Sequence, residues 1–325
     1  MNKVIKVISG IGKGLLILLS VLAVFLIVMT VINSIMLKKE AAVFDKPIGQ
    51  MVEVDDHNMC VYTEGEGDHT IVFLSGSSIP SPILDYKPLY SRLTDDYRIV
   101  VIEKFGYGYS DVVDSERSFE TMLRQDREAL ASLGIEGPFI LCPHSMSGLE
   151  ALMWAQDYPE EVEAIVGLDM TVLETYDDFS ERLEGMKSTK WIYDFLRTTG
   201  LLRLLPDSML SIPGTLSEEE IQTYRQILYV KLLNETVYNE AFYVEEARDR
   251  IRSSPKPLVP MILFVSDGTG TGRDEETWHG YTEDYARGMD NISVICLSCG
   301  HDLHHVEYEA IEENMRDFIE NSLDK

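Results

Sequence analysis

A long run of residues without charge near the amino terminus places the strongest constraint on this chain. The 24 residues between Lys13 and Lys38, GLLILLSVLAVFLIVMTVINSIML, contain no Asp, Glu, Lys or Arg. At about 1.5 Å per residue, a helix of this length reaches roughly 36 Å, enough to cross the roughly 30 Å hydrocarbon layer of a bilayer. The apolar region of a cleaved secretory signal is usually shorter, about 7 to 15 residues. We therefore predict a retained transmembrane helix over residues 15–37.

Positive charges flank both ends of the predicted transmembrane helix. They are Lys3, Lys6 and Lys13 on one side and Lys38, Lys39 and Lys46 on the other. The charged amino terminus adds a slight excess to the short tail, which favours a cytoplasmic amino terminus. We therefore predict a single-pass protein of the cell membrane with its body outside the cytoplasm. Residues 1–14 are then a short basic tail and residues 38–48 a linker.

The rest of the chain is strongly acidic. The sequence of 325 residues contains 28 Lys and Arg against 55 Asp and Glu, for a formal net charge of −27. Such a surface repels the phosphates of nucleic acids, so we expect no nucleic-acid partner. With 45% hydrophobic residues the body has enough apolar surface to fold as a globule. The four cysteines give no disulfide framework and leave the oligomeric state and redox compartment open.

Short apolar segments alternate with helical ones along the body. Strands that are separated by helices predict a mostly parallel sheet with helices on both faces. We expect eight strands, at MVEV, MCVYTEG, TIVFLS, YRIVVIE, PFILC, EAIVGLD, MILFVS and ISVICLS.

One segment interrupts this alternation. Residues 171–256 contain no clear strand but several amphipathic stretches, one of which begins at Ser217 and has Glu220 in the position of a capping box. We predict a helical lid over residues 171–256. The core then consists of residues 49–170 and 257–325.

The sharpest local motif is a buried strand that runs through a tight turn into a helix, PFILCPHSMSGLEALMWAQDYP. Ser145 lies in this turn. A serine there is lifted above the edge of the sheet, and the free N–H groups at the helix start favour a developing negative charge. Ser145 alone could also simply cap the helix. The interpretation as a nucleophile therefore depends on the rest of the chain.

Several motifs together resemble the α/β-hydrolase superfamily, over nearly the whole body from Val52 to Phe318. The turn is a variant of the GxSxG motif in which Pro143 and Ser147 replace the two glycines. EKFGYGYSD resembles the loop after the fourth strand, and FLSGSS stands where the superfamily has its His-Gly loop. The resemblance implies an eight-stranded α/β-hydrolase fold with a helical lid. It also implies that the oxyanion hole is formed by the backbone N–H groups of Ser77 and Met146.

A serine nucleophile needs a histidine base and an acid that orients this base. His301 follows the last strand, where the superfamily has a Gly-His loop, and we predict it to be the base. Asp169 follows the sixth strand and is the favoured acid. Asp267, after the seventh strand, is the alternative acid, with Asp274 a more distant one. Both Asp169 and Asp267 keep the chain order serine, acid, histidine.

A metal site is a competing interpretation of the C-terminal segment. The segment contains Cys296, Cys299, His301, His304 and His305, all of which are types of zinc ligand. Cys296 lies within a predicted strand, so Cys299 leaves from the opposite face, and the spacing is not a haem motif. We therefore predict no metal and no cofactor, and a phosphate-binding glycine loop is not evident either.

We predict from these features a membrane-anchored serine hydrolase that cleaves an ester or related acyl bond through Ser145, His301 and Asp169 by way of an acyl-enzyme. The substrate is a small acyl compound. The predicted lid supplies candidate apolar wall residues, namely Trp191, Phe195, Leu201, Leu202 and Leu205. Two alternatives remain, an aminopeptidase resembling proline iminopeptidases and a catalytically silent hydrolase-fold binding protein.

Overall fold

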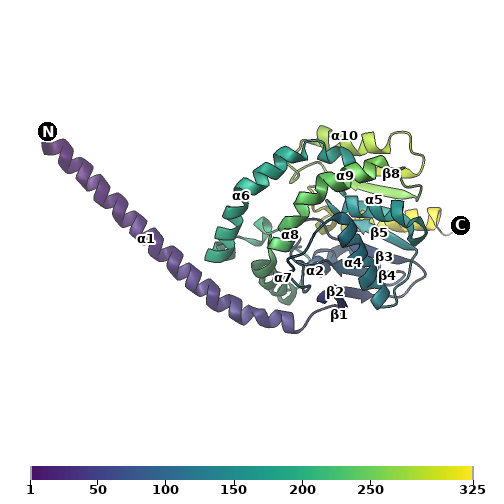
Figure 1. Cartoon of the computed structure of the whole chain (residues 1–325), viewed down its shortest axis with the longest axis horizontal. Coiled ribbons are helices and arrows are strands. Elements are labelled where there is room, and N and C mark those ends of the chain that lie inside the picture. The colour runs from purple at the N-terminus through teal and green to yellow at the C-terminus, as the bar shows by residue number, and fades with distance from the viewer. Residues whose placement is uncertain (1, 324–325) are drawn as a thin grey trace.

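The computed structural model describes residues 2–323 and has an eight-stranded sheet at its centre (Figure 1). The strands are β1 (Gln50–Val54), β2 (His57–Glu64), β3 (Thr70–Leu74), β4 (Arg98–Glu103), β5 (Phe139–Pro143), β6 (Val162–Leu168), β7 (Met261–Val265) and β8 (Ile292–Cys296). Their order is β1-β2-β4-β3-β5-β6-β7-β8. Only β2 runs antiparallel to its neighbours in this sheet of described strands. The predicted mostly parallel sheet is therefore confirmed.

Alternating side chains of the strands bury both faces of the sheet. In β3, Val72 and Leu74 belong to one hydrophobic cluster, and Ile71 and Phe73 belong to another. The helices of the first face are α4 (Phe119–Ser132), α5 (Ser147–Asp157) and α9 (Val244–Ser253). Those of the second face are α2 (Pro82–Asp85), α3 (Lys87–Tyr90) and α11 (Tyr308–Ser322). At the edge of the sheet, α10 (Glu275–Ala286) packs beside β8.

The chain between β6 and β7 contains the segment predicted as a lid, and its elements before α9 are called the lid below. Its elements are η3 (Leu173–Tyr176), α6 (Phe179–Thr199), η4 (Leu201–Leu204), η5 (Asp207–Met209), α7 (Glu218–Lys231), α8 (Glu235–Glu240), η6 (Ala241–Tyr243) and α9. Figure 1 shows α6 and α7 on the side of the body that faces the N-terminal helix. In contrast, α9 packs against α4 and α5. The C-terminal end of the predicted lid segment thus belongs to the helix layer of the core.

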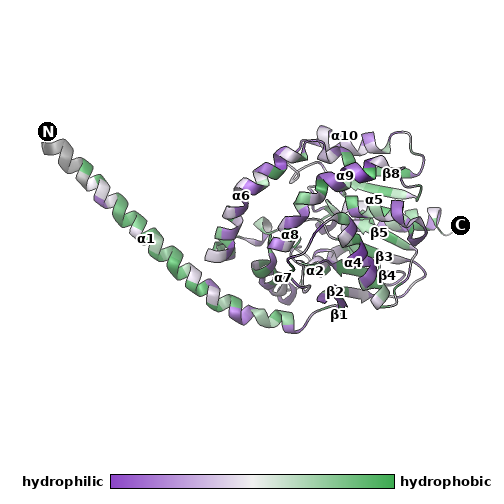
Figure 2. Ribbon diagram, in the orientation of Figure 1, coloured by the Kyte–Doolittle hydropathy of each residue, from purple (hydrophilic) through white to green (hydrophobic). Residues whose placement is uncertain are grey.

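One long helix, α1 (Asn2–Glu40), projects from the body and is followed by the short helix η1 (Ala41–Asp45) (Figure 1). It has the length and composition to cross a membrane. Figure 2 shows that α1 is mostly hydrophobic until it approaches the body. Most of the segment predicted as a linker is helical, because Glu40 is buried against the lid, where Arg203 donates two hydrogen bonds to its carboxylate.

The loop after β4 closes around a buried carboxylate. Glu103 accepts a hydrogen bond from the backbone N–H of Tyr109 at 2.7 Å. Burial raises the pKa of Glu103 to about 7. Lys231 in α7 donates to the carbonyl oxygen of Ser110 in the same loop. These contacts fasten the lid to the carboxyl end of β4.

We predict that Gly108→Ala strongly destabilises the protein. Gly108 has φ +46°, and a Cβ at this position would lie 1.9 Å from the carboxyl carbon of Glu103. The substitution therefore adds overpacking to backbone strain, for a total of about 2 to 5 kcal/mol. The measurement is chemical unfolding of the full chain in detergent micelles.

Gly134→Ala is the matched control for this substitution. Gly134 also has a positive φ, +66°, but a Cβ there would meet no heavy atom within 4 Å. It should cost only about 1 kcal/mol of strain. Equal losses of stability in the two variants would contradict the packing of Gly108 on Glu103.

Candidate active site

Ser145 lies in the turn between β5 and α5 and has a strained backbone. Its φ is +53°, in the left-handed region that side chains rarely adopt. The backbone N–H and the hydroxyl of Thr171 both donate to the Ser145 carbonyl oxygen at 2.9 Å. Ser147, which replaces a glycine of the usual motif, is buried and donates from its hydroxyl to the Leu74 carbonyl at 2.7 Å. The turn is thus held by hydrogen bonds on both sides of Ser145.

A continuous chain of hydrogen bonds connects Ser145, His301 and Asp169. The Ser145 Oγ lies 2.9 Å from Nε2 of His301, and Nδ1 of the same ring lies 2.6 Å from Oδ2 of Asp169. The three residues come from the turn after β5, the loop after β8 and the end of β6. The structure therefore brings together residues that are separated by up to 156 positions in the sequence.

Asp169 is buried and receives four hydrogen bonds. Besides His301, the donors are the backbone N–H and the hydroxyl of Ser266, both at 2.7 Å, and the indole N–H of Trp278 at 2.9 Å. Burial alone would raise the pKa of Asp169, but the hydrogen bond from His301 and the other donors outweigh it and hold this pKa below its usual value. Asp169 is thus an ionised acceptor fixed toward the His301 ring.

The alternative acids lie outside this chain of hydrogen bonds. Asp267 directs its carboxylate to the backbone N–H of Thr269 at 2.8 Å. Asp274 caps α10 through the backbone N–H of Thr277 at 2.9 Å. Both carboxylates stabilise local backbone, and among the three candidates Asp169 is the one hydrogen-bonded to His301.

Two cavities meet at Ser145. The larger one, of about 360 Å³, extends under the lid and is bordered by Ser77, Ser145 and His301 together with apolar lid residues. The smaller one, of about 170 Å³, is lined by Ser77, Ser145, Met146 and His301 and extends toward Tyr176. Ser77 and Met146, the two residues of the predicted oxyanion hole, thus line one cavity together with Ser145.

The predicted wall residues of the lid divide into two groups. Leu202 and Leu205 line the larger cavity. Trp191, Phe195 and Leu201 do not line it, and the first two are exposed on α6. Further lining residues, which were not predicted from the sequence, include Ile79, Tyr193, Leu196, Met209, Leu210 and Leu228.

His144 packs directly against His301. The two rings have centroids 4.7 Å apart, and Nε2 of His144 donates to the His301 carbonyl oxygen at 3.1 Å. Burial and the neighbouring His301 and His304 lower the pKa of His144 to about 3. His144 is therefore a neutral ring that supports the loop carrying His301.

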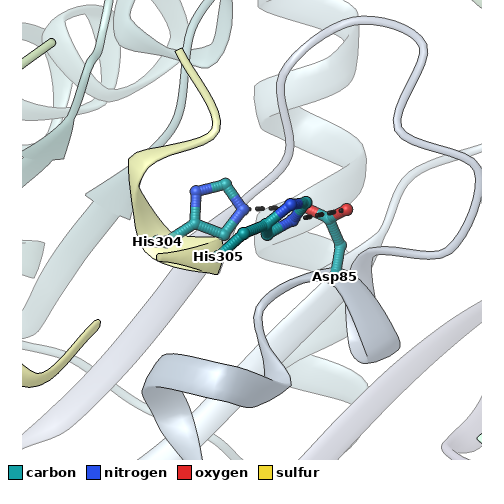
Figure 3. Close-up of side chains that lie close together, drawn as sticks. All are labelled: Asp85, His304 and His305. Atoms are coloured by element: carbon teal, nitrogen blue, oxygen red, sulfur yellow. Dashed lines mark hydrogen bonds and ion pairs between the residues drawn. The ribbon is translucent and has the colours of Figure 1, made fainter. Parts of the chain in front are cut away.

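A second polar cluster borders the larger cavity. Figure 3 shows His304 and His305 pointing from one short helix, η7 (Leu303–His305), toward Asp85 of α2. Nε2 of His304 lies 2.8 Å and Nε2 of His305 lies 3.1 Å from the Asp85 carboxylate, and the Tyr224 hydroxyl donates to it at 3.0 Å. The two histidines thus hold the Asp85 carboxylate from the segment just before α11.

The cluster has ligand types for a metal, with ligand atoms within 4.8 Å of one another. Its carboxylate already binds both imidazoles. Burial alone would lower the pKa of His305, but the nearby Asp85 charge raises it, so the arrangement favours a buried ion pair. No sequence motif marks Asp85, so the sequence analysis did not predict this cluster.

The comparisons with known proteins agree with this architecture. No protein-family model matches the chain. The uncharacterized protein YbdG of Bacillus subtilis is 34% identical over 268 residues, which are 81% of this chain and 80% of YbdG. The epoxide hydrolase of Bacillus megaterium in complex with an inhibitor has a TM-score of 0.61 and 18% identity, over 83% of this chain and 99% of that one. Cfl2 from Burkholderia cenocepacia has a TM-score of 0.57 and 19% identity, over 83% and 94%.

The order of the sheet, its helical layers and these structural matches define the α/β-hydrolase fold. The resemblance found in the sequence is therefore confirmed for the fold. The chain belongs to the family of Bacillus subtilis YbdG.

We predict that His144 makes the protein less stable at mildly acidic pH. The pKa of His144 is about 3 in the folded chain, against about 6.5 when unfolded. Between these values the unfolded state binds more protons, so stability falls as the pH falls below 6.5. From pH 7 to pH 5, the wild type should lose on the order of 2 kcal/mol more than His144→Gln, as measured by chemical unfolding. Parallel losses in both proteins would contradict the buried neutral state of His144.

Proposed function

We propose that this protein is a membrane-anchored serine hydrolase that cleaves an ester or related acyl bond. The observation that carries the proposal is the hydrogen-bonded chain from Ser145 through His301 to the buried Asp169. In this proposal Ser145 is the nucleophile, His301 the general base and Asp169 the residue that orients and stabilises the imidazolium.

The first half of the reaction transfers the acyl group to Ser145. Nε2 of His301 accepts the hydroxyl proton while Oγ forms a bond to the substrate carbonyl carbon. The oxyanion that develops is stabilised by two backbone N–H groups, that of Ser77 and that of Met146, the residue at the start of α5. The tetrahedral intermediate collapses, and the leaving alcohol takes the proton from His301.

The second half of the reaction returns the enzyme to its starting state. His301 accepts a proton from water, and the hydroxide oxygen bonds to the acyl carbon. The Ser145 oxygen then leaves and regains its proton from His301, and the carboxylic acid departs. The low pKa of Asp169 supports this cycle, because the carboxylate stays ionised while the imidazole becomes positive.

The lining of the larger cavity favours an apolar acyl group. Most residues on its lid side are apolar, and they include Leu202, Leu205 and Leu228. This wall supports an ester substrate over an amino-acyl amide, because the aliphatic side chains of the lid offer no hydrogen-bond acceptor to an ammonium group that loses its hydration against them. The intact chain of hydrogen bonds at Ser145 supports an enzyme over a catalytically silent binding protein.

The membrane anchor in this proposal is α1. The burial of Asn33 and Glu40 against the lid supports a helix that is retained, because removal of α1 would expose these contacts. The charged amino terminus gives the short tail a slight excess of positive charge, which supports a cytoplasmic tail and a body outside the cytoplasm.

We predict that a fluorophosphonate probe labels the wild type and that Ser145→Ala abolishes the labelling. Asp169→Asn should slow it by about 10³-fold or more, because the imidazole loses its orienting charge. The measurement is the second-order labelling rate of the full chain in detergent.

Asp267→Asn is the matched control for the acid. It removes a carboxylate of the neighbouring loop that binds Thr269 of its own loop, so the labelling rate should stay within about twofold of wild type. A folded wild type that never labels, or equal losses in the two Asn variants, would contradict the proposed roles.

We predict that α1 remains part of the mature protein. After expression in a bacterium, the full chain should stay in the membrane pellet through an alkaline carbonate wash, and mass spectrometry should find peptides that precede residue 38. The physical reason is that extraction would expose the apolar surface of the whole helix to water. A soluble protein that begins after residue 38 would instead identify a cleaved signal.

A further inference from the structure

The lid is joined directly to α1. The side-chain amide of Asn33 donates to the carbonyl oxygens of Arg197 and Thr198, at 2.9 and 3.2 Å. These two residues form the last turn of α6. Gly200, with φ +74°, packs so closely on Asn33 that a Cβ would lie 2.6 Å from the Asn33 Cβ.

Arg203 completes this junction from η4. It donates to the Asn33 Oδ1 at 2.8 Å and forms a paired hydrogen bond with the Glu40 carboxylate at 2.7 and 2.6 Å. Its guanidinium also lies 4.1 Å from the ring centroid of Tyr229 in α7. Asn33 and Glu40 are both buried. The lid is therefore held at two levels of α1, about 10 Å apart along the helix axis.

The position of Asn33 fixes the depth of the lid. Asn33 belongs to the run without charge that ends before Lys38. It lies five residues before that lysine, which is about 7 Å along the helix axis. If α1 spans the bilayer, the junction of α6 with η4 lies at the level where the hydrocarbon layer meets the headgroups.

The part of the lid near this junction exposes large apolar side chains. Trp191 is 66% exposed and Leu204 60% exposed, and Ile192 and Phe195 are exposed on the same stretch of α6. Asp194, the acidic group among them, is paired with Lys190 and Arg197. The preceding half of α6, by contrast, exposes charged residues such as Glu181 and Lys187. Aromatic and aliphatic side chains beside paired charges are typical of the bilayer interface.

The same elements form the wall of the cavity at Ser145. Tyr193 and Leu196 of α6 and Leu202 of η4 line this cavity. Met209 of η5 lines it too and is 67% exposed. The inner wall is thus continuous with the exposed apolar surface. In Figure 1, α6 lies on the side of the body that faces α1.

We propose that the lid segment 191–209 rests in the bilayer interface and that the cavity at Ser145 takes an acyl ester of a membrane lipid directly from it. The proposal rests on the proposed function, both for the chemistry of Ser145 and for α1 as an anchor. The lipid acyl group is transferred to Ser145 and the lipid alcohol departs. Water then releases the acyl group as a fatty acid.

Trp191 is a built-in probe of this contact. The other two tryptophans, Trp154 and Trp278, are buried. The full chain is reconstituted into vesicles of phosphatidylcholine, with or without bromine on the acyl chains. Bromine quenches tryptophan fluorescence only at contact. We therefore expect the brominated lipid to remove about the fraction of the wild-type fluorescence that comes from Trp191, which is the fraction lost in Trp191→Phe. The fluorescence of Trp191→Phe itself should be nearly unquenched. Equal, small quenching in both proteins would overturn the proposal. It would mean that Trp191 contacts water or a second copy of the chain and not the lipid.

A second experiment measures turnover. Trp191→Glu/Leu204→Glu places two charges on the exposed face, and neither residue lines the cavity. We expect fatty-acid release from diacylglycerol in phosphatidylcholine vesicles to fall about tenfold or more, because a charge resists entry into the interface. Hydrolysis of the soluble ester 4-nitrophenyl butyrate should stay within about twofold of wild type.

Leu258→Glu is the matched control, since Leu258 is 90% exposed and borders neither cavity at Ser145. It should change neither rate. If the wild type hydrolyses the soluble ester but not the vesicle lipid, or if the two lid charges leave lipid hydrolysis unchanged, the lipid proposal is wrong and the hydrolase stands. If the wild type hydrolyses neither substrate and resists the fluorophosphonate, the hydrolase proposal itself fails.

Discussion

The hydrogen bonds that join Ser145, His301 and Asp169 depend on the parallel arrangement of the central strands. The carboxyl ends of β5, β6 and β8 lie at one edge of the sheet, so three short loops can bring a hydroxyl, a carboxylate and an imidazole together. The cost of this arrangement is local. Ser145 and Asp169 both have positive φ, and neighbouring donors such as Thr171 and Ser266 hold them there.

A second constraint connects this site to the N-terminal helix. The lid that covers Ser145 is bound to α1 through Asn33 and Glu40, and it is bound to the core through Lys231 and the loop after β4. The lid is therefore fastened at both of its sides. In addition to its length and apolar character, which suit a membrane span, α1 positions the lid. This contact explains why α1 remains helical beyond residue 37, where the predicted transmembrane helix ends.

Much of the fold could be predicted from the sequence, because buried strands and amphipathic helices leave regular patterns. Ser145 and His301 could be singled out for a related reason, since each follows a strand in a short loop of small residues. The acid could not be decided in this way. Asp169 and Asp267 both follow strands. They differ in their hydrogen-bond partners, because the register of the strands places the donors of Ser266 and Trp278 beside the Asp169 carboxylate.

Other features left no local signal in the sequence. Asp85 meets His304 and His305 across 219 positions or more, so their contact depends on packing alone. Trp191 and Leu202 are both apolar lid residues, yet one lies outside and the other lines the cavity. The segment 171–256 predicted as a lid includes α9, which packs against α4 and α5, because a helix that covers the sheet and a helix that covers the site have the same amphipathic pattern.

The most direct test of the site is a crystal structure of the full chain after reaction with an organophosphonate. The phosphorus should be bonded to Ser145 Oγ, and the phosphonyl oxygen should accept hydrogen bonds from the backbone N–H groups of Ser77 and Met146, with His301 still bound to Asp169. A phosphorus on another residue, or a phosphonyl oxygen that points away from these two N–H groups, would contradict the proposed arrangement.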